Sequence, residues 1–329
     1  MKYYLAPMEG ITTYIFRSAY HRHFGGVDKY FTPFISNKGL SSRERNDVLP
    51  EHNVGISLVP QILTNRAEEF LAIAEQLADY GYTTVNLNLG CPSGTVVARK
   101  RGAGFLSIPD ELDRFLDEIY RKCPLEISIK TRVGMSDLTE WEGLLSIYEK
   151  YPVSELIVHP RLQTEGYKGT PHREAYARAE ERLQTPLCYN GDIDSVVARD
   201  GLLQEFPQVA AIMIGRGILK RPELLEELKE TEITSAEVFP SSGQDAQPPT
   251  RTNLEVLKAF HDEILEGYIQ IMSGDQPTLF KMKDLWTFLS SGFENSEKCL
   301  KKIRKANRIG DYRSAVEEVF ERTKIWTMG

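Results

Sequence analysis

The chain lacks any uninterrupted apolar stretch of about 18 residues, the length that a membrane-spanning helix needs, and its first residues show no signal-peptide pattern. Its four cysteines, Cys91, Cys123, Cys188 and Cys299, form no CxxC motif and have no paired histidines. This spacing argues against both a disulfide framework and a zinc site. We therefore expect a cytoplasmic protein without a metal ion, in which any working cysteine acts alone.

The sequence also lacks an excess of positive charge, because 40 Lys and Arg face 47 Asp and Glu, giving a formal net charge of -7. This balance argues against non-specific binding to polyanions. The distribution is uneven, however: residues 251–329 carry 13 basic and 12 acidic side chains, and six of the basic ones lie between Lys298 and Arg308. The C-terminal segment can therefore still offer a local surface for phosphate groups.

Short runs typical of β-strands recur along the first two thirds of the chain, each followed by a helical pattern. Several are almost wholly apolar, as expected for strands buried on both faces of a parallel sheet. Eight repeats fit a closed (β/α)8 barrel better than an open doubly wound sheet, which more often has about five or six strands. The predicted strands are residues 2–6, 28–32, 56–61, 84–88, 126–130, 155–159, 186–190 and 209–215.

Residues 231–250 separate two regions of different character. This segment is rich in Ser, Pro, Gln and Thr and has no apolar periodicity, which is typical of a linker. Beyond it, apolar residues such as Leu257, Phe260 and Ile264 keep helical spacing. We therefore predict an α/β protein with a TIM barrel over residues 1–230, a linker over 231–250 and an all-helical domain over 251–329.

Polar side chains and glycines follow most of the predicted strands. In β/α barrels the reactive groups come from the carboxyl ends of the strands and the loops after them, so these residues should gather at one mouth of the barrel. They are Pro7 with Met8, Gln61, Asn88 with Cys91, Lys130 with Arg132, His159 with Arg161, Asn190-Gly191-Asp192, and Gly215-Arg216-Gly217.

The last two of these loops indicate a phosphorylated cofactor. Phosphate groups in such barrels often bind after the seventh and eighth strands, and Gly191, Gly215 and Gly217 would let backbone N–H groups approach one closely. Arg216 would add a charge-assisted contact. The alternative is that the glycines only form tight turns.

Lys130 ends the strand-like run EISIK, where its ammonium group would be partly buried unless an anion matches it. The anionic edge of a reduced flavin is one such partner, and a neighbouring carboxylate is another. A Schiff-base lysine of a barrel aldolase is a third possibility, since buried lysines lower their pKa readily. Gln61, Asn88 and His159 leave a similar choice between ligand contacts and ordinary hydrogen-bonded barrel residues.

Taken together, these motifs resemble the tRNA-dihydrouridine synthase family from Leu5 to about Arg221, with a weaker similarity in the C-terminal helices. Their order, spacing and strand context all agree. The matching residues are Ala6-Pro7-Met8-Glu9-Gly10 with Phe16-Arg17, Gln61, Asn88-Leu89-Gly90-Cys91-Pro92-Ser93, Gly102-Ala103-Gly104, Lys130-Thr131-Arg132-Val133-Gly134, Val158-His159, Asn190-Gly191-Asp192 and Gly215-Arg216-Gly217.

The resemblance implies FMN as the prosthetic group, NADPH as the reductant and a helical domain that helps to bind tRNA. At positions that match the family, it implies that Asn88 and Cys91 face the uracil ring. The residues that it places around FMN are Pro7, Met8, Gln61, Lys130, His159, Asn190, Gly191, Asp192, Gly215 and Arg216.

The mechanism that follows is hydride transfer from flavin N5 to uracil C6, with the Cys91 thiol protonating C5 from the other face of the ring. A thiol suits this role because its ordinary pKa of about 8.5 leaves it mostly protonated at neutral pH. The alternative is that Cys91 is a small buried apolar residue. Its Gly-Cys-Pro turn at a strand end disfavours that interpretation.

The target uridine must leave its stack to reach a flavin, so affinity for tRNA would come from basic side chains elsewhere. Two clusters suit phosphate groups, although a charged run by itself is more often a solvated helix face. The predicted substrate contacts, besides Asn88, are Arg99, Lys100, Arg101, Arg132, Lys301, Lys302, Arg304 and Lys305.

The sequence departs from the family pattern at three positions near these motifs. Gly94 stands where many relatives carry lysine, Thr13 where aspartate is common, and Pro160 where glycine usually follows the histidine. These departures leave the cofactor prediction intact and concern the local substrate contacts.

Three other functions stay open for a barrel of this kind. An FMN-dependent enzyme acting on a free pyrimidine such as dihydroorotate is disfavoured by the basic helical appendage. A non-catalytic RNA-binding barrel is disfavoured because both Cys91 and Lys130 are present. A flavin-free aldolase would trap its substrate on Lys130. We further expect the protein to be a monomer.

Overall fold

The computed structural model describes residues 1–36, 39–236, 254–293 and 297–322. Contacts within the chain divide it into two compact units. The first comprises Met1–Glu9, Asp28–Asp192 and Gly201–Ile214, and the second comprises Gly10–Val27, Ile193–Asp200 and Gly215–Gly329. All the strands of the described residues belong to the first unit.

The first unit is built on a parallel sheet that closes into a barrel. Its strand order is β3-β2-β1-β9-β8-β7-β6-β5-β4. The two strands at the ends of this order, β3 (Leu58–Val59) and β4 (Gln61–Ile62), are separated only by Pro60, so the sheet returns to its starting point. The remaining strands are β1 (Lys2–Leu5), β2 (Lys29–Phe31), β5 (Thr84–Leu89), β6 (Glu126–Arg132), β7 (Leu156–His159), β8 (Leu187–Tyr189) and β9 (Ala211–Ile214).

The predicted fold class is confirmed, since the chain is a (β/α)8 TIM barrel with C-terminal helices. All eight predicted strands are present, and the third is divided into β3 and β4 at Pro60, which has no N–H group to donate to a neighbouring strand. Strands β7 and β9 are buried along their whole length, as the apolar runs in the sequence predicted.

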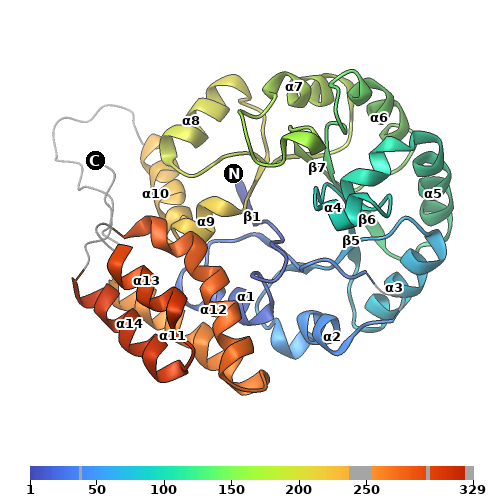
Figure 1. Ribbon diagram of the computed structural model, residues 1–329. Coiled ribbons are helices and arrows are strands. Elements are labelled where there is room, and N and C mark those ends of the chain that lie inside the picture. The colour runs from blue at the N-terminus through green and yellow to red at the C-terminus, as the bar shows by residue number, and fades with distance from the viewer. Residues whose placement is uncertain (37–38, 237–253, 294–296, 323–329) are drawn as a thin grey trace, which may run out of the picture. The chain divides into compact units, whose positions relative to one another are not determined.

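Helices cover the outside of the strands in the first unit, and Figure 1 shows α3, α5, α6 and α7 around β5, β6 and β7. Helix α5 illustrates why they form: Pro109 lies in its first turn, and it buries Leu112, Phe115, Leu116 and Ile119 at helical spacing. The α-helices that lie between β2 and β9 in the sequence are α2 (Ser42–Val48), α3 (Ala67–Asp79), α4 (Gly94–Val97), α5 (Pro109–Lys122), α6 (Glu140–Tyr148), α7 (Arg173–Arg182) and α8 (Val196–Glu205).

The second unit combines helices from distant parts of the sequence. Phe260 lies at the centre of an aromatic cluster, with ring centroids 5.5 Å from Phe16, 6.2 Å from Tyr20 and 5.3 Å from Phe24. Helix α1 therefore packs on α11, a pairing that the sequence patterns did not indicate. The helices are α1 (Tyr14–His23), α9 (Arg216–Lys220), α10 (Leu224–Ala236), α11 (Leu254–Ile271), α12 (Asp275–Leu289), α13 (Glu297–Lys305) and α14 (Ile309–Arg322).

The segment predicted as a linker is helical at its start, because α10 continues through residues 231–236. Residues 237–250 of that segment lie outside the described residues. The division of the chain at 1–230, 231–250 and 251–329 stays a prediction. Within the described ranges, no helix is both long enough and apolar enough to cross a membrane.

Gly104 lies in a short 3-10 helix (Gly102–Ser107) after α4, against the backbone of Val97. A Cβ atom at this position would come within 2.7 Å of the Val97 carbonyl oxygen and 2.8 Å of its Cα. We therefore expect Gly104→Ala to lower the free energy of unfolding by about 1–3 kcal/mol, as overpacking does. Urea unfolding followed by circular dichroism measures this change.

Gly143 provides the matched control, because it lies in α6 with open space where a Cβ would be. Gly143→Ala should raise the free energy of unfolding by about 0.5–1 kcal/mol, since alanine forms helix more readily. Equal unfolding midpoints for Gly104→Ala and the wild type would contradict the close packing described here.

Candidate active site

The register of the sheet brings the predicted polar residues to one mouth of the barrel. Asn88 of β5 is aligned with Lys130 of β6, and Arg132 of β6 is aligned with His159 of β7. Lys130 is also aligned with Ile157, a member of the buried interior cluster. Because side chains alternate between the two faces of a strand, Asn88 and Lys130 point into the barrel.

The amides of Gln61 and Asn88 are bonded to each other. Asn88 Nδ2 donates to Gln61 Oε1 at 2.7 Å, and Gln61 Nε2 donates to Asn86 Oδ1 at 2.8 Å. Gln61 and Asn88 are both buried, with 1% and 7% of their surfaces exposed. The structure thus brings together two residues predicted to contact a planar heterocycle, and it shows that each orients the other.

The Cys91 turn follows directly from the Asn88 side chain. Asn88 Oδ1 accepts hydrogen bonds from the backbone N–H groups of Gly90 and Cys91, at 3.0 and 2.9 Å. On the other side, Gly102 has a φ of +55°, and a Cβ there would lie 2.9 Å from the Cys91 carbonyl oxygen. The Cys91 backbone is therefore bonded to the Asn88 side chain and packed closely against Gly102.

The Cys91 thiol is partly buried, and burial raises its pKa. A hydrogen bond from the Ser93 backbone and the positive charges of Lys130 and Arg132 act in the opposite direction, while Glu9 adds to the rise. The net effect keeps the thiol protonated at neutral pH. Cys91 therefore suits a proton donor rather than a thiolate nucleophile.

Lys130 is the cation beneath this turn. Burial, reinforced by the positive charge of Arg132, lowers its pKa from 10.5 to about 8. Its ammonium group forms no hydrogen bond or ion pair with another side chain in the part of the chain that the structure describes, so the alternative of a carboxylate partner is not realised there. A partly buried cation without a counter-charge fits the anionic edge of a flavin ring.

Arg132 has a different environment although it is only two residues away. Its guanidinium donates to three backbone carbonyls, those of Gly90 at 3.0 Å, Leu162 at 2.9 Å and Gly166 at 2.7 Å. It is also almost fully buried. Arg132 therefore ties the Cys91 turn to the loop after β7, and its predicted substrate contact stays a prediction.

His159 is oriented by Arg161, a residue noted in the sequence but not assigned a role. Arg161 is fully buried, forms an ion pair with Asp192 and donates to His159 Nε2 at 3.2 Å. Because a guanidinium can only donate, His159 Nε2 is the acceptor and the ring proton lies on Nδ1. The structure thus links the predicted cofactor residues His159 and Asp192 through Arg161.

Tyr167, in the loop after β7, was missed by the sequence reasoning. Its ring lies 6.0 Å from the His159 ring, and the Arg132 guanidinium lies 5.5 Å from its centroid. The side chain is 48% exposed, so one part of a planar ring remains accessible beside two predicted site residues. The available signal was an aromatic residue between two glycines, in the run Gly-Tyr-Lys-Gly.

The other predicted cofactor residues occupy the ends of the first and last strands. Pro7 and Met8 follow β1 and are partly exposed. Asn190, after β8, donates from Nδ2 to the Met213 carbonyl of β9 at 2.8 Å, and Gly191 beside it is buried. Gly215 and Arg216 begin α9 in the second unit. Their phosphate contacts stay predictions.

The three basic residues after the Cys91 turn have different roles. Arg99 and Lys100 are exposed, and Lys100 donates to Ser107 Oγ at 3.1 Å. Arg101 instead forms an ion pair of 2.9 Å with Glu69 of α3, which ties the segment after Cys91 to that helix. Arg99 and Lys100 are therefore the members of this cluster that can meet a phosphate without losing an ion pair.

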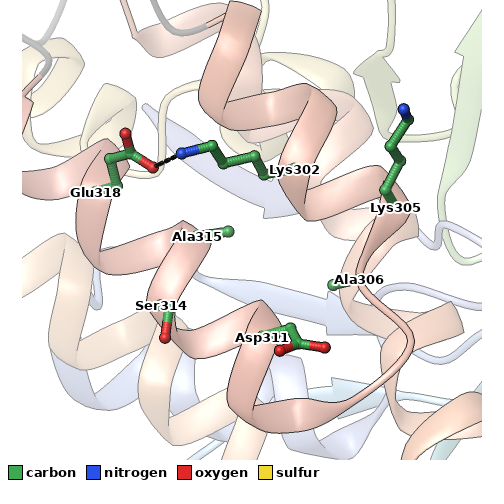
Figure 2. A pocket seen from close by; sticks show the side chains of 7 residues that line it. All are labelled: Lys302, Lys305, Ala306, Asp311, Ser314, Ala315 and Glu318. Carbon is green, nitrogen blue, oxygen red and sulfur yellow. Dashed lines mark hydrogen bonds and ion pairs between the residues drawn. The ribbon is translucent and has the colours of Figure 1, made fainter.

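The basic side chains of α13 are all exposed, including Lys301, Lys302, Arg304 and Lys305. Figure 2 shows a groove between α13 and α14, and its charged lining consists of two lysines and two carboxylates. Lys302 lies 2.5 Å from Glu318 across this groove. The two lysines of the groove are balanced by its two carboxylates. Lys301 and Arg304 lie outside the lining, so they are the basic side chains of α13 chosen to test phosphate binding.

The chain is similar to known proteins over most of its length. The family described as dihydrouridine synthase (Dus) matches residues 4–305. The chain is 29% identical over 272 residues to a tRNA-dihydrouridine(16) synthase of Pseudomonas syringae pv. tomato, covering 77% of this chain and 82% of that protein. It is 31% identical over 241 residues to the enzyme of the same name from Aquipseudomonas alcaligenes, and the match covers 69% of this chain and 75% of that protein.

Similar solved structures include morphinone reductase, with a TM-score of 0.50 and 12% identity over 70% of this chain and 86% of that one. Histamine dehydrogenase from Rhizobium sp. 4-9 matches with a TM-score of 0.52 and 10% identity, over 71% of this chain and 46% of that one. At these identities the likeness shows the barrel fold alone.

The lowered pKa of Lys130 predicts that this residue reduces the free energy of unfolding of the flavin-free protein in a pH-dependent way. The unfolded chain keeps the ordinary pKa of 10.5 while the folded pKa is about 8, so protonation favours the unfolded state. Below the folded pKa the penalty is complete, and it fades as the pH rises toward the unfolded pKa. We expect Lys130→Met to unfold at a higher urea concentration than the wild type at pH 7, with a difference that disappears at alkaline pH.

Lys122→Met is the control, because Lys122 is an exposed lysine at the end of α5. This variant should keep the pH dependence of the wild type. A Lys130→Met protein whose stability difference from the wild type is the same at pH 7 and pH 10 would show that the Lys130 pKa is not lowered.

Proposed function

The chain belongs to the dihydrouridine synthase family, and from this premise we propose that it reduces a uridine of tRNA to 5,6-dihydrouridine, with FMN as cofactor and NADPH as reductant. The observation that carries the proposal is the pair formed by Cys91 and Lys130. A protonated, partly buried thiol lies at a barrel mouth near a partly buried cation that has no counter-charge among the described residues. The names of the relatives from both Pseudomonas syringae pv. tomato and Aquipseudomonas alcaligenes support tRNA as the substrate.

The residues around the mouth fit FMN. Bound FMN would supply the hydride that uracil C6 receives. Lys130 would hold the anionic edge of the ring, and the Nδ1–H of His159 would donate to a phosphate or a ring carbonyl. The other proposed contacts are Pro7, Met8, Gln61, Asn190, Gly191, Asp192, Gly215 and Arg216.

Cys91 completes the reduction by donating its proton to uracil C5. NADPH provides the two electrons, C6 gains the hydride, C5 gains the thiol proton, and the C5–C6 double bond becomes a single bond. The thiolate that remains lies near Lys130 and Arg132, whose positive charges lower the Cys91 pKa. These cations would stabilise it until a proton returns from solvent.

The two basic clusters would provide affinity for the tRNA backbone. Arg99 and Lys100 are exposed immediately after the Cys91 turn, and α13 exposes Lys301 and Arg304. Phosphate contacts of this kind are independent of base sequence, so recognition of one uridine must come from the mouth itself. A monomeric enzyme acting in the cytoplasm, where tRNA is modified, is part of the same proposal.

Cys91→Ala tests the proton donor. We expect the variant to bind FMN and to be reduced by NADPH like the wild type, but to form dihydrouridine at least about 100-fold more slowly, because general acid catalysis typically contributes that much. Cys123→Ala is the matched control, since Cys123 is also partly buried and its pKa is also raised by burial. Anaerobic reduction followed by addition of unmodified tRNA measures both steps.

The same assay distinguishes the substrates. Reoxidation of the reduced flavin by unmodified tRNA, but not by uracil or orotate, is the expected result. Reoxidation by a free pyrimidine alone would replace tRNA with a small substrate. Full dihydrouridine formation by Cys91→Ala would remove Cys91 as the proton donor.

The basic surface of α13 generates a separate prediction. Reversing two charges in Lys301→Glu/Arg304→Glu should weaken tRNA binding and reduce the slope of log K against log salt by about 0.7–0.9 for each phosphate that the variant no longer binds. The value of kcat at saturating tRNA should stay unchanged. Arg121→Glu/Lys122→Glu reverses two exposed charges at the end of α5 and should leave the affinity near that of the wild type. Equally weakened binding in the two double variants would point to net charge instead of a binding surface.

A further inference from the structure

A continuous chain of hydrogen-bonded side chains runs from the barrel interior to the Cys91 turn. Ser128 Oγ donates to the Val85 carbonyl at 3.2 Å, and Asn86 Nδ2 donates to Ser128 Oγ at 2.9 Å. Gln61 Nε2 then donates to Asn86 Oδ1, and Asn88 Nδ2 donates to Gln61 Oε1, at 2.8 and 2.7 Å. The four side chains are between 0% and 7% exposed.

Backbone groups at both ends of this series of hydrogen bonds fix which side-chain atom donates and which accepts. At one end, Asn88 Oδ1 faces the N–H groups of Gly90 and Cys91, which can only donate. At the other end, the Ser128 hydroxyl faces the Val85 carbonyl, which can only accept. Turning over any one amide would place two donors or two acceptors against each other in a buried position. Each amide therefore has one orientation.

The buried polar side chains of Asn86 and Ser128 lower the stability of the fold unless each of their polar atoms forms a hydrogen bond. The interior of a β/α barrel is usually filled by branched aliphatic side chains, and Asn86 and Ser128 lie at aligned positions of β5 and β6, one pair deeper than Asn88 and Lys130. An apolar pair there would fill space without the need to satisfy buried donors and acceptors. Asn86 and Ser128 are connected through Gln61 to Asn88, which binds the backbone of Cys91, the predicted proton donor.

We propose that Asn86 and Ser128 are positioning residues, which fix the amide orientations of Gln61 and Asn88 and thereby the place of the Cys91 thiol. The inference rests on the proposed function for its meaning in catalysis. Removing the Asn86 carbonyl leaves Gln61 Nε2 without its acceptor, so Gln61 can turn over and Asn88 Nδ2 loses its acceptor in turn. The Asn88 side chain can then rotate away from the Cys91 N–H.

Two substitutions at Asn86 separate orientation from packing. Asn86→Leu keeps the approximate size and removes both polar atoms. Asn86→Asp keeps an acceptor toward Gln61, and in its protonated form it also keeps a donor toward Ser128. We expect kcat for dihydrouridine formation to fall at least about tenfold in Asn86→Leu, because small misplacements of reacting groups have large kinetic effects, with KM for tRNA within about twofold of the wild type.

The kcat of Asn86→Asp should stay within about twofold of the wild type. The protonated aspartate can form the same hydrogen bonds to Gln61 and Ser128 in the same donor-to-acceptor direction. Asn53→Leu is the matched control: Asn53 is as buried as Asn88, and its amide donates to the Asp47 and Leu49 carbonyls beside α2. It should lose stability in urea while keeping kcat. Ser128→Ala removes the acceptor of Asn86 Nδ2 and the donor to the Val85 carbonyl. It serves if Asn86→Leu does not fold, and its kcat should fall in the same direction.

Alkylation of Cys91 by iodoacetamide in the flavin-free protein gives a readout that needs no turnover. Peptide mass spectrometry should show a Cys91 rate changed by about threefold or more in Asn86→Leu and unchanged in Asn86→Asp and Asn53→Leu. Wild-type kcat and alkylation in Asn86→Leu, or equal defects in Asn86→Leu and Asn86→Asp, would overturn the inference. A wild-type enzyme that makes no dihydrouridine would refute the proposed function, while the alkylation rates would still decide the positioning.

Discussion

The two hydrogen bonds that the Asn88 side-chain carbonyl accepts from the Gly90 and Cys91 N–H groups are the interaction on which the site depends. They convert the end of β5 into a turn that presents a thiol at the barrel mouth. The Asn88 amide can serve this purpose only in one orientation, and Gln61 is the neighbour that enforces it. The position of the Cys91 turn therefore depends on the side chains of Asn88 and Gln61, which lie before it in the sequence.

The electrostatics of the site depend on an asymmetry between two neighbouring cations of β6. Three backbone carbonyls surround the Arg132 guanidinium, so its charge is matched by dipoles within the protein. Lys130 has no such partners among the described residues, and burial lowers its pKa to about 8. An anionic ligand beside the Lys130 ammonium group would remove this penalty.

The barrel was predictable because strands buried on both faces must be apolar, and β7 and β9 show this clearly. The division of the third strand at Pro60 was not predicted, although proline lacks the N–H group that a continuous strand needs there. The ion pair of Arg101 and the backbone partners of Arg132 could not be predicted in this way. A guanidinium near a catalytic motif resembles a phosphate contact in sequence, whereas its true environment depends on Glu69 and on carbonyls of a loop about 30 residues away.

The sequence by itself determined the fold class, the strands and the set of chemically capable residues at their ends, since periodicity and residue type are local properties. Only the tertiary structure decided which of those residues contact or hydrogen-bond one another. It showed that Asn88 holds the Cys91 turn, that Arg161 orients His159, that Tyr167 lies beside both His159 and Arg132, and that Phe260 of α11 packs on α1. Hydrogen-bond direction and burial are relations between distant segments, and no local pattern encodes them.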